Sequence, residues 1–327
     1  MDFSIRSYKI GDEEEVVELW NQCLPCDRII PCIFEEKILL DPNFDLNGCR
    51  IAEKEGKIIG FIYALVRKTP LPWGFNSFLL EEEKRGIGYI VALFVHQEYR
   101  RKGVGNALLK EALNFFQSKK RKKVVLFSYD PNYLLAGLDT QSYPGALEFF
   151  KKYGFTIQGE SVGMGRDLYK LKIPEEIEEM EKRLKNEGII AQYFDSKYIL
   201  PTISFFLENF PHWLHNFVEK LERGHDLDEM VIVLKENREV IGYCQHRFGH
   251  HLERVGPFGV NEKFRGRRIG SIMLSRLLSR MAEKGYKFAW FTSTDRAKTY
   301  YARMGFKVMR KQVHMTKNLG GNSYEEK

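Results

Sequence analysis

The sequence predicts an α/β (α+β) fold with two domains of one plan, each a mixed, mostly antiparallel sheet flanked by helices. Three observations predict this class. The chain has 327 residues, more than one hydrophobic core usually organises. Stretches with the two-residue period of strands alternate with stretches of helical period. Their order in the first half recurs in the second half, which indicates an internal repeat.

The first half predicts its elements from local patterns. A helix should begin at Asp12, because Glu15 follows at the spacing of a capping box. A hairpin should turn at Glu55 and Gly56. Residues 89–95 are apolar throughout, which favours a strand buried on both faces. The predicted order is a helix from residue 12, a hairpin over 50–63, a strand over 89–95, a turn over 100–105 that begins a helix, a strand over 124–128 and a short helix ending near residue 155.

The second half repeats this order, and the repeat sets the expected domains. Its predicted elements are a helix over 197–221, a hairpin over 230–243, a strand over 254–260, a turn over 265–270 that begins a helix, a strand over 288–291 and a short helix ending near residue 306. We therefore expect domains over 1–172 and 189–320, joined by an amphipathic linker helix over 173–188, with a tail over 321–327.

Composition places the chain among ordinary globular proteins. Hydrophobic residues make up 43% and charged residues 29%, and no apolar run reaches the roughly 20 residues that cross a bilayer. The N-terminus carries early charges and lacks the apolar segment of a secretory signal, so we expect a cytoplasmic protein without a membrane partner. The five cysteines are irregularly spaced, which favours reduced thiols. Cys23 and Cys26 lack a second pair to complete a zinc site, so we expect no metal.

The net charge of +7 gives a basic surface that attracts polyanions. The densest basic run, over 119–123, ends a predicted helix, where cations suit the negative end of the dipole. Neither zinc-finger spacing nor an aromatic RNA-binding pattern accompanies this run, so nucleic acid is not an expected partner.

The basic turn of the first half is the motif that carries chemistry. Arg100, Gly103 and Gly105 lead from the buried strand directly into a helix. Backbone N–H groups at a helix start point outward at the positive end of the dipole. Glycine lets an anion approach them because it has no Cβ. The turn is therefore typical of a diphosphate site, although its glycines could also serve close packing of helix and strand.

This turn and the end of each half resemble the GNAT family of acetyltransferases. Arg100-x-x-Gly103-x-Gly105 is similar to the family's coenzyme-A loop. Residues 146–155 and 297–306 are similar to its ending, Ala-x-x-Phe-Tyr followed by Gly-Phe. The resemblance covers nearly the whole chain, in the order of tandem GNAT proteins. It implies acetyl-CoA as cofactor and a small-molecule or peptide amine as acceptor, attacked directly in a ternary complex. A homo-oligomer is compatible with it.

The resemblance also implies site residues. The strand before the turn should diverge from its neighbour and offer free backbone groups to the pantetheine arm, and a tyrosine of the closing helix should protonate the departing thiolate. The coenzyme-binding residues expected in this way are Leu93, Phe94, Val95, Arg100, Arg101, Lys102, Gly103, Val104, Gly105 and Asn106 in the first half, and Val260, Arg265, Arg268 and Gly270 in the second.

The two halves differ at the positions that matter most. The first has the complete loop but carries Phe150 at the tyrosine position. The second carries Tyr301 there, but Arg268 replaces the first glycine of the loop. Arg268 would either crowd a diphosphate or grip it by charge. We expect coenzyme binding in the first domain, and Tyr301 as the catalytic acid if the second site works.

The first half is also longer between the turn and the closing Gly-Phe pair. Gly103 and Gly154 are 51 positions apart, whereas Arg268 and Gly305 are 37 apart. The 14 extra residues fall within 130–144, after the strand that should end on the acyl face. We expect this segment to form part of the acceptor pocket.

The inserted segment brings catalytic candidates to a domain that lacks the usual tyrosine. Asp139 and Tyr143 are the main candidates, beside Asp130. Both aspartates could instead be turn residues that hydrogen-bond the backbone. An alternative function remains open, in which a non-catalytic protein binds acyl-CoA and uses a degenerate copy as a scaffold.

Overall fold

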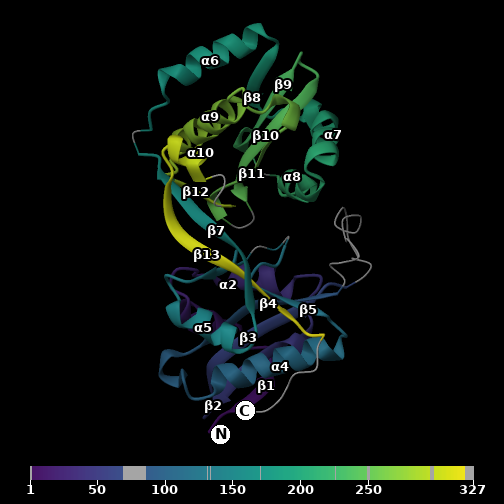
Figure 1. The fold of residues 1–327 in the computed structure, drawn as a ribbon, viewed down its shortest axis with the longest axis vertical. Helices are drawn as coiled ribbons and strands as arrows, with labels where there is room; N and C mark the ends of the chain where they lie inside the picture. The colour runs from purple at the N-terminus through teal and green to yellow at the C-terminus, as the bar shows by residue number, and fades with distance from the viewer. Residues whose placement is uncertain are drawn as a thin grey trace. The chain divides into compact units, whose positions relative to one another are not determined.

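The computed structural model describes residues 2–68, 86–130, 132, 134–169, 171–224, 226–248, 251–294 and 298–320. The expected tail over 321–327 lies outside this range. The chain forms two compact units (Figure 1). The first unit contains the residues up to Ser161 together with those from Arg310 on, and the second contains Val162–Met309.

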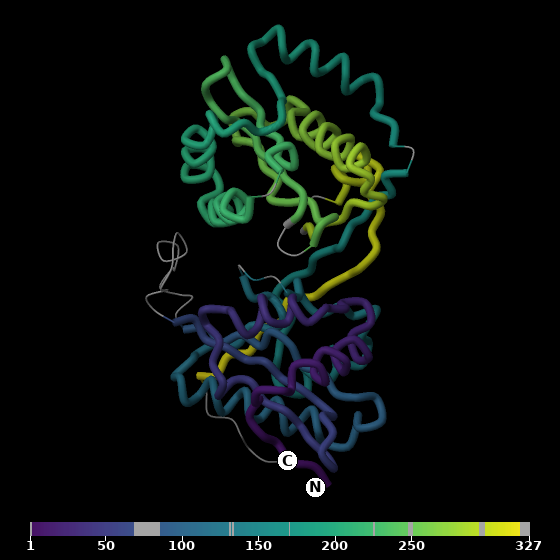
Figure 2. Tube along the Cα trace, turned by 180° about the vertical axis from the view of Figure 1, so that it is seen from behind, coloured from purple at the N-terminus to yellow at the C-terminus, as the bar shows by residue number. Residues whose placement is uncertain are grey.

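These units do not coincide with the expected domain ranges, 1–172 and 189–320. Two long strands explain the difference, because β7 (Thr156–Asp167) ends in the second unit and β13 (Lys307–Asn318) ends in the first. In both views the yellow C-terminal strand enters the unit built mainly from the N-terminal half (Figures 1 and 2). The hydrophobic pattern of a strand does not show which neighbouring strands it pairs with. The boundary between the two units was therefore not predictable from the sequence pattern.

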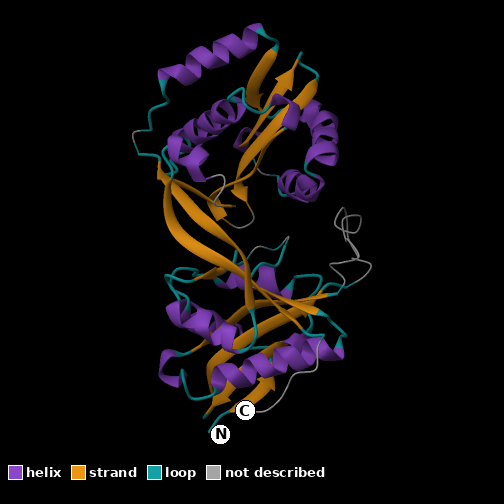
Figure 3. Ribbon diagram, viewed as in Figure 1, coloured by secondary structure: helices purple, strands orange, loops and turns teal. Residues whose placement is uncertain are grey.

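The sheet of the first unit has the order β1-β2-β3-β4-β5-β13-β7, and β6 pairs with β13. Helices flank the strands (Figure 3), with α4 over one core and α1 over the other. The elements are β1 (Ser4–Ser7), α1 (Glu13–Cys23), α2 (Pro31–Phe34), η1 (Glu35–Leu39), η2 (Leu46–Gly48), β2 (Cys49–Lys54), β3 (Lys57–Val66), β4 (Ile87–Val95), η4 (Gln97–Tyr99), α4 (Val104–Ser118), β5 (Lys123–Leu126), β6 (Leu138–Asp139) and α5 (Pro144–Lys152).

Local signals place most of these elements. The hairpin of β2 and β3 turns where Glu55 and Gly56 take positive φ angles of 52° and 78°, which suit the twist of a two-residue turn. The expected capping box is wrong, although α1 does begin after Asp12. The Asp12 carboxylate accepts hydrogen bonds from Arg6 instead, and Glu15 accepts one from the N–H of Ile58.

The second unit continues with the strand order β7-β12-β11-β10-β9-β8. The linker helix forms as α6 and packs against β8 and α9. The helix expected over 197–221 is wrong as a single element, because the chain breaks at Pro211, whose ring cannot continue a helix. The elements are α6 (Glu175–Asn186), β8 (Ile189–Tyr193), η5 (Ser196–Tyr198), α7 (Ile199–Asn209), η6 (Pro211–Trp213), α8 (Leu214–Glu222), η7 (Leu227–Glu229), β9 (Met230–Lys235), β10 (Glu239–Phe248), β11 (His251–Val260), η8 (Glu262–Phe264), α9 (Ile269–Glu283), β12 (Phe288–Thr294) and α10 (Lys298–Arg303).

Within the described ranges, every helix is too short or too polar to cross a membrane.

Candidate active site

The central parallel strands of the first unit diverge. β4 and β5 are paired only from Ile87 to Ile90 of β4, and the last bond runs from the Phe127 N–H to the Ile90 carbonyl at 2.8 Å. Phe127 then takes a left-handed φ of 58°, which turns the chain away, while β4 continues to Val95. The sheet is therefore open beside the second half of β4.

Backbone groups of β4 point into this opening. The N–H of His96 donates to the carbonyl of Ile59 at 2.9 Å, so these residues form a hydrogen-bonded pair with β3. Bonded and non-bonded pairs alternate along an antiparallel ladder. Val95 and Leu93 consequently turn their N–H and C=O groups away from β3, toward the side where β5 has ended. Arg100 Nε donates to the Val95 carbonyl at 3.0 Å and fixes the basic turn against the strand.

The basic turn presents backbone N–H groups at the start of α4. Arg101 and Gly103 have left-handed φ angles of 61° and 89°. The first intrahelical bond runs from the Ala107 N–H to the Gly103 carbonyl, so the N–H groups of residues 104–106 have no acceptor within the helix. A Cβ on Gly103 would meet nothing within 4 Å. This geometry fits an anion such as a diphosphate.

The opening and the turn face one cleft of about 1010 Å³. Its wall combines the end of β4, the basic turn, the loop after α1, the segment after β5 and the first turns of α5. The expected residues on this wall are Leu93, Phe94, Val95, Arg100, Arg101, Gly103, Gly105, Asn106, Asp139 and Tyr143. Two expected residues point elsewhere, since Val104 is buried in the core and the Lys102 ammonium lies over the Tyr99 ring.

A polar network forms one wall of the cleft. Tyr143 Oη donates to Asp27 Oδ2 at 2.8 Å. The Arg310 guanidinium donates twice to the Asp27 carboxylate, at 2.8 Å each, and its Nε donates to Asp139 Oδ2 at 2.7 Å. Asp139 also accepts bonds from the Ser142 N–H and hydroxyl. The insertion therefore places Asp139 and Tyr143 at the cleft, as part of a network that includes a residue of β13.

The network sets the protonation states of its members. Burial alone would raise the pKa of Asp139, but the bonds from Ser142 and Arg310 outweigh it and hold that pKa below its ordinary value. Burial, followed by the Asp27 carboxylate, raises the pKa of Tyr143 above its ordinary value. Tyr143 therefore stays protonated at neutral pH, and Asp139 is an anion.

The second unit repeats the backbone of this site. Arg265 Nε donates to the Val260 carbonyl at 3.2 Å, as Arg100 does in the first unit. Arg268 precedes α9 with a left-handed φ of 59°, the conformation that Gly103 has before α4. Its side chain is more than half exposed and lies 3.6 Å from Glu176.

Aromatic side chains cover the start of α9. A Cβ on Gly270 would lie 2.9 Å from the Tyr300 hydroxyl and 3.1 Å from the Phe258 ring. The equivalent Cβ on Gly105 would meet Phe149 only at 3.5 Å, an ordinary contact. The Tyr300 hydroxyl and the Phe258 ring therefore lie close to the α9 turn, at the position where the α4 turn is open to the cleft.

Tyr301 belongs to this aromatic packing. Its ring centroid lies 4.2 Å from that of Phe291 and 5.9 Å from that of Phe258. Phe150 packs against Phe127 in the first unit in a similar way, at 5.6 Å. Burial raises the pKa of Tyr301 above its ordinary value.

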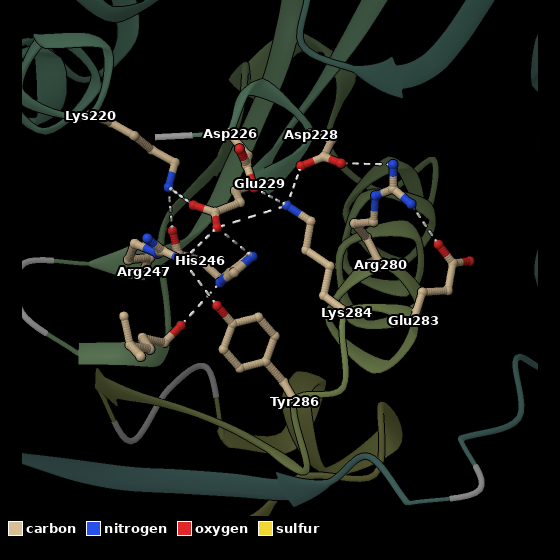
Figure 4. Close-up of polar contacts among 11 residues, drawn as sticks. Lys220, Asp226, Asp228, Glu229, His246, Arg247, Arg280, Glu283, Lys284 and Tyr286 are labelled. Carbon is tan, nitrogen blue, oxygen red and sulfur yellow. Dashed lines mark hydrogen bonds and ion pairs between the residues drawn. The ribbon is translucent and has the colours of Figure 1, made fainter. Parts of the chain in front are cut away.

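The second unit also holds a cluster of buried charges near the C-terminal end of α9 (Figure 4). Lys220 Nζ lies 2.7 Å from Glu229 Oε2, and both side chains are at most 1% exposed. Arg247 approaches the other oxygen of Glu229 at 3.0 Å, and His246 Nε2 lies 4.0 Å from it. Because Lys220, Glu229 and His246 are shielded from solvent, we interpret the cluster as structural.

Sequence reasoning missed Asp27 and Arg310. No motif links them, since they are 283 positions apart, and Arg310 follows the closing Gly-Phe pair of the other half. Only the fold brings them to one wall.

The first unit places a splayed parallel pair beside a basic turn and a helix start, and the second unit repeats the turn and the helix start. The chain belongs to the acetyltransferase (GNAT) family, because the GNAT domain model matches residues 45–157 and 228–308, more than half of the chain.

Known proteins are similar to the chain over part or all of its length. An uncharacterized N-acetyltransferase of Methanocaldococcus jannaschii is 29% identical over 111 residues, which cover 34% of this chain and 40% of that protein. A GCN5-related glucosamine N-acetyltransferase region of a fungal multi-domain β-N-acetylglucosaminidase has a TM-score of 0.75 at 20% identity, over 96% of this chain and 38% of that one. A tandem GNAT protein from the clavulanic acid biosynthesis pathway has a TM-score of 0.66 at 14% identity, over 98% and 100%. At these identities the two structures speak for the fold.

Proposed function

We propose that the protein transfers an acetyl group from acetyl-CoA to a primary amine, by direct attack in a ternary complex, in the cleft of the first unit. One observation carries the proposal. The free N–H groups at the start of α4, the open edge of β4 and the polar network of Asp27, Tyr143 and Asp139 border a single cleft. GNAT acetyltransferases generally use acetyl-CoA, which supplies the acetyl group as a thioester.

The cleft has a basic end and a polar end. At the basic end, the N–H groups of residues 104–106 and the charges of Arg100 and Arg101 would hold the diphosphate. The outward N–H and C=O groups of Leu93 would pair with the amides of the pantetheine arm. Any N–H there that reaches the thioester oxygen would also stabilise negative charge as the amine attacks.

The polar end handles protons. An alkylammonium acceptor with a pKa of about 10.4 must lose one proton to solvent before it attacks. Its nitrogen loses a second proton as the amide forms, and the departing sulfur must gain one. We assign acceptance to Asp27 and donation to Tyr143. The 2.8 Å hydrogen bond between them lets a proton pass from Asp27 to Tyr143 and restore both groups. Tyr301 is the less suitable donor, because Phe258 and Phe291 enclose it.

A pair of aspartate substitutions tests which unit binds the coenzyme. Gly103→Asp places a side chain on a strained left-handed φ of 89°, where a Cβ meets nothing within 4 Å. It should still fold, because aspartate is one of the few residues that occasionally adopt left-handed φ and a carboxylate suits a helix start. It should weaken acetyl-CoA binding in calorimetry by at least about tenfold through repulsion of the diphosphate. Arg268→Asp places a carboxylate at the equivalent position of the second unit and should leave binding intact. The opposite pattern would move the coenzyme to the second unit.

Turnover tests the enzyme assignment. Release of thiol from acetyl-CoA across a panel of amines should be saturable, and Tyr143→Phe should lower kcat by about 100-fold, within the range of general acid catalysis. Tyr153→Phe, at the opposite end of α5 and not among the cleft residues, is the control. Saturable binding without turnover on any amine would favour the non-catalytic acyl-CoA-binding protein.

A further inference from the structure

Three separate segments meet at the polar end of the first unit's cleft. Asp27 lies in the loop between α1 and α2, Asp139 in the short strand β6, and Tyr143 just before α5. The side chain that joins them is Arg310 of β13, which donates to both carboxylates and to the carbonyl of Cys26 at 3.3 Å.

Arg310 donates hydrogen bonds through all three nitrogens of its guanidinium group. Nε bonds one aspartate, while the two terminal nitrogens bond both oxygens of the other. A lysine ammonium has the charge but not this planar geometry. Asp139 keeps its bonds from Ser142 and the Gln141 N–H without the arginine. Asp27, by contrast, would keep only Tyr143 among its side-chain partners. The negative charge of the Asp139 carboxylate would then no longer be balanced by the arginine that joins the two.

The arginine at position 310 is not a feature that the two halves of the chain share. Arg310 lies five residues after Gly305 in the closing strand of the second half. The residue five positions after Gly154, at the same place in the first half, is Gly159. Packing common to the two copies therefore does not account for an arginine here, whereas the two aspartates at the cleft do.

We infer that Arg310 is a positioning residue, which the closing strand of the second half supplies to orient Asp27 and Tyr143 at the acceptor end of the first unit's cleft. The inference rests on the proposed function for its catalytic consequence. The duplicated chain thus completes a site that the first half alone leaves without its central cation.

The test compares two arginines of the same unit. Arg310→Lys keeps the charge and removes the planar guanidinium group. Arg6→Lys is the matched control, because Arg6 also donates twice to one carboxylate, Asp12, and through Nε to another, Glu53. The carboxylate partners of Arg6 do not line the cleft, whereas Asp27 and Asp139 do. The side-chain exposure of Arg6, 22%, is close to the 27% of Arg310.

Arg310→Lys should lower kcat/KM for the acceptor by about tenfold or more, as expected for losing charge-assisted hydrogen bonds, and leave acetyl-CoA affinity within about twofold because the basic end is untouched. Arg6→Lys should leave both quantities unchanged. Equal kinetics in the two variants, or a loss of acetyl-CoA affinity as large as the loss for the acceptor, would overturn the inference.

Hydrogen exchange separates this inference from the proposed function, because it needs no substrate. Arg310→Lys should speed exchange of the backbone over 24–30 and 138–143, whereas Arg6→Lys should not. A wild-type protein inactive on every amine would reject the proposed function, and faster exchange in these two segments would then still support the positioning role. Unchanged exchange would reject that role.

Discussion

Replacing His246 by asparagine should remove much of the acid sensitivity of the second unit. The His246 side chain is fully buried, and its Nδ1 lies 3.0 Å from the Leu252 carbonyl. That acceptor requires a proton on Nδ1, so in the neutral ring Nε2 is bare. The charged groups around the ring are Glu229, Lys220 and Arg247, and the Tyr286 ring packs against it at 5.0 Å. Burial, the main cause, lowers the pKa of His246 to about 4.

The magnitude follows from linkage. The unfolded ring has a pKa of about 6.5 and the folded ring about 4, so the unfolded state binds the proton first as the pH falls. The stability that the neutral His246 ring contributes to the second unit is fully present above about pH 6.5 and is lost as the pH falls toward 4. Between about pH 7 and pH 5 this one group should remove about 2 kcal/mol from the free energy of unfolding. Most carboxylates titrate below that window.

The assay must read the second unit by itself, because two compact units need not unfold as one. Hydrogen exchange of β9 and α9 peptides along a urea gradient, at about pH 7 and pH 5, gives the free energy of unfolding of that unit. His246→Asn can still donate to Leu252 but does not titrate. The drop between the two pH values should be about 2 kcal/mol smaller in the variant. A drop equal to that of the wild type would refute a neutral buried His246.

Two further predictions concern stability. Lys220→Met should lower the free energy of unfolding of the second unit by about 3–5 kcal/mol, because it leaves the buried Glu229 carboxylate without its nearest cation. Lys197→Met, in an exposed ion pair, should change the urea midpoint little, and similar shifts in the two variants would contradict the burial argument. Gly48→Ala should lower the free energy of unfolding of the first unit by about 3 kcal/mol or more, because its Cβ would lie 1.9 Å from the backbone carbonyl oxygen of Ala64. A Cβ on Gly145 meets nothing within 4 Å, so Gly145→Ala should leave the melting temperature unchanged or higher.

Much of the basic end of the cleft was predictable because its signals are local. A buried strand, a basic turn and a helix follow each other without a gap, and the backbone of such a unit presents N–H groups wherever it occurs. The same reasoning located the insertion whose Asp139 and Tyr143 line the cleft. It also noted Arg268 at the glycine position, but not that its side chain would extend toward Glu176.

The sequence by itself determined the duplicated α/β plan, the order of the elements and the anion-binding turn, since hydrophobic period and turn chemistry act over a few neighbouring residues. Only the tertiary structure decided that β7 and β13 each end in the other compact unit, that aromatic rings lie close to the start of α9, and that Arg310 contacts Asp27. These contacts join segments far apart in the chain. Their geometry depends on how sheets and side chains pack, and no short-range pattern encodes it.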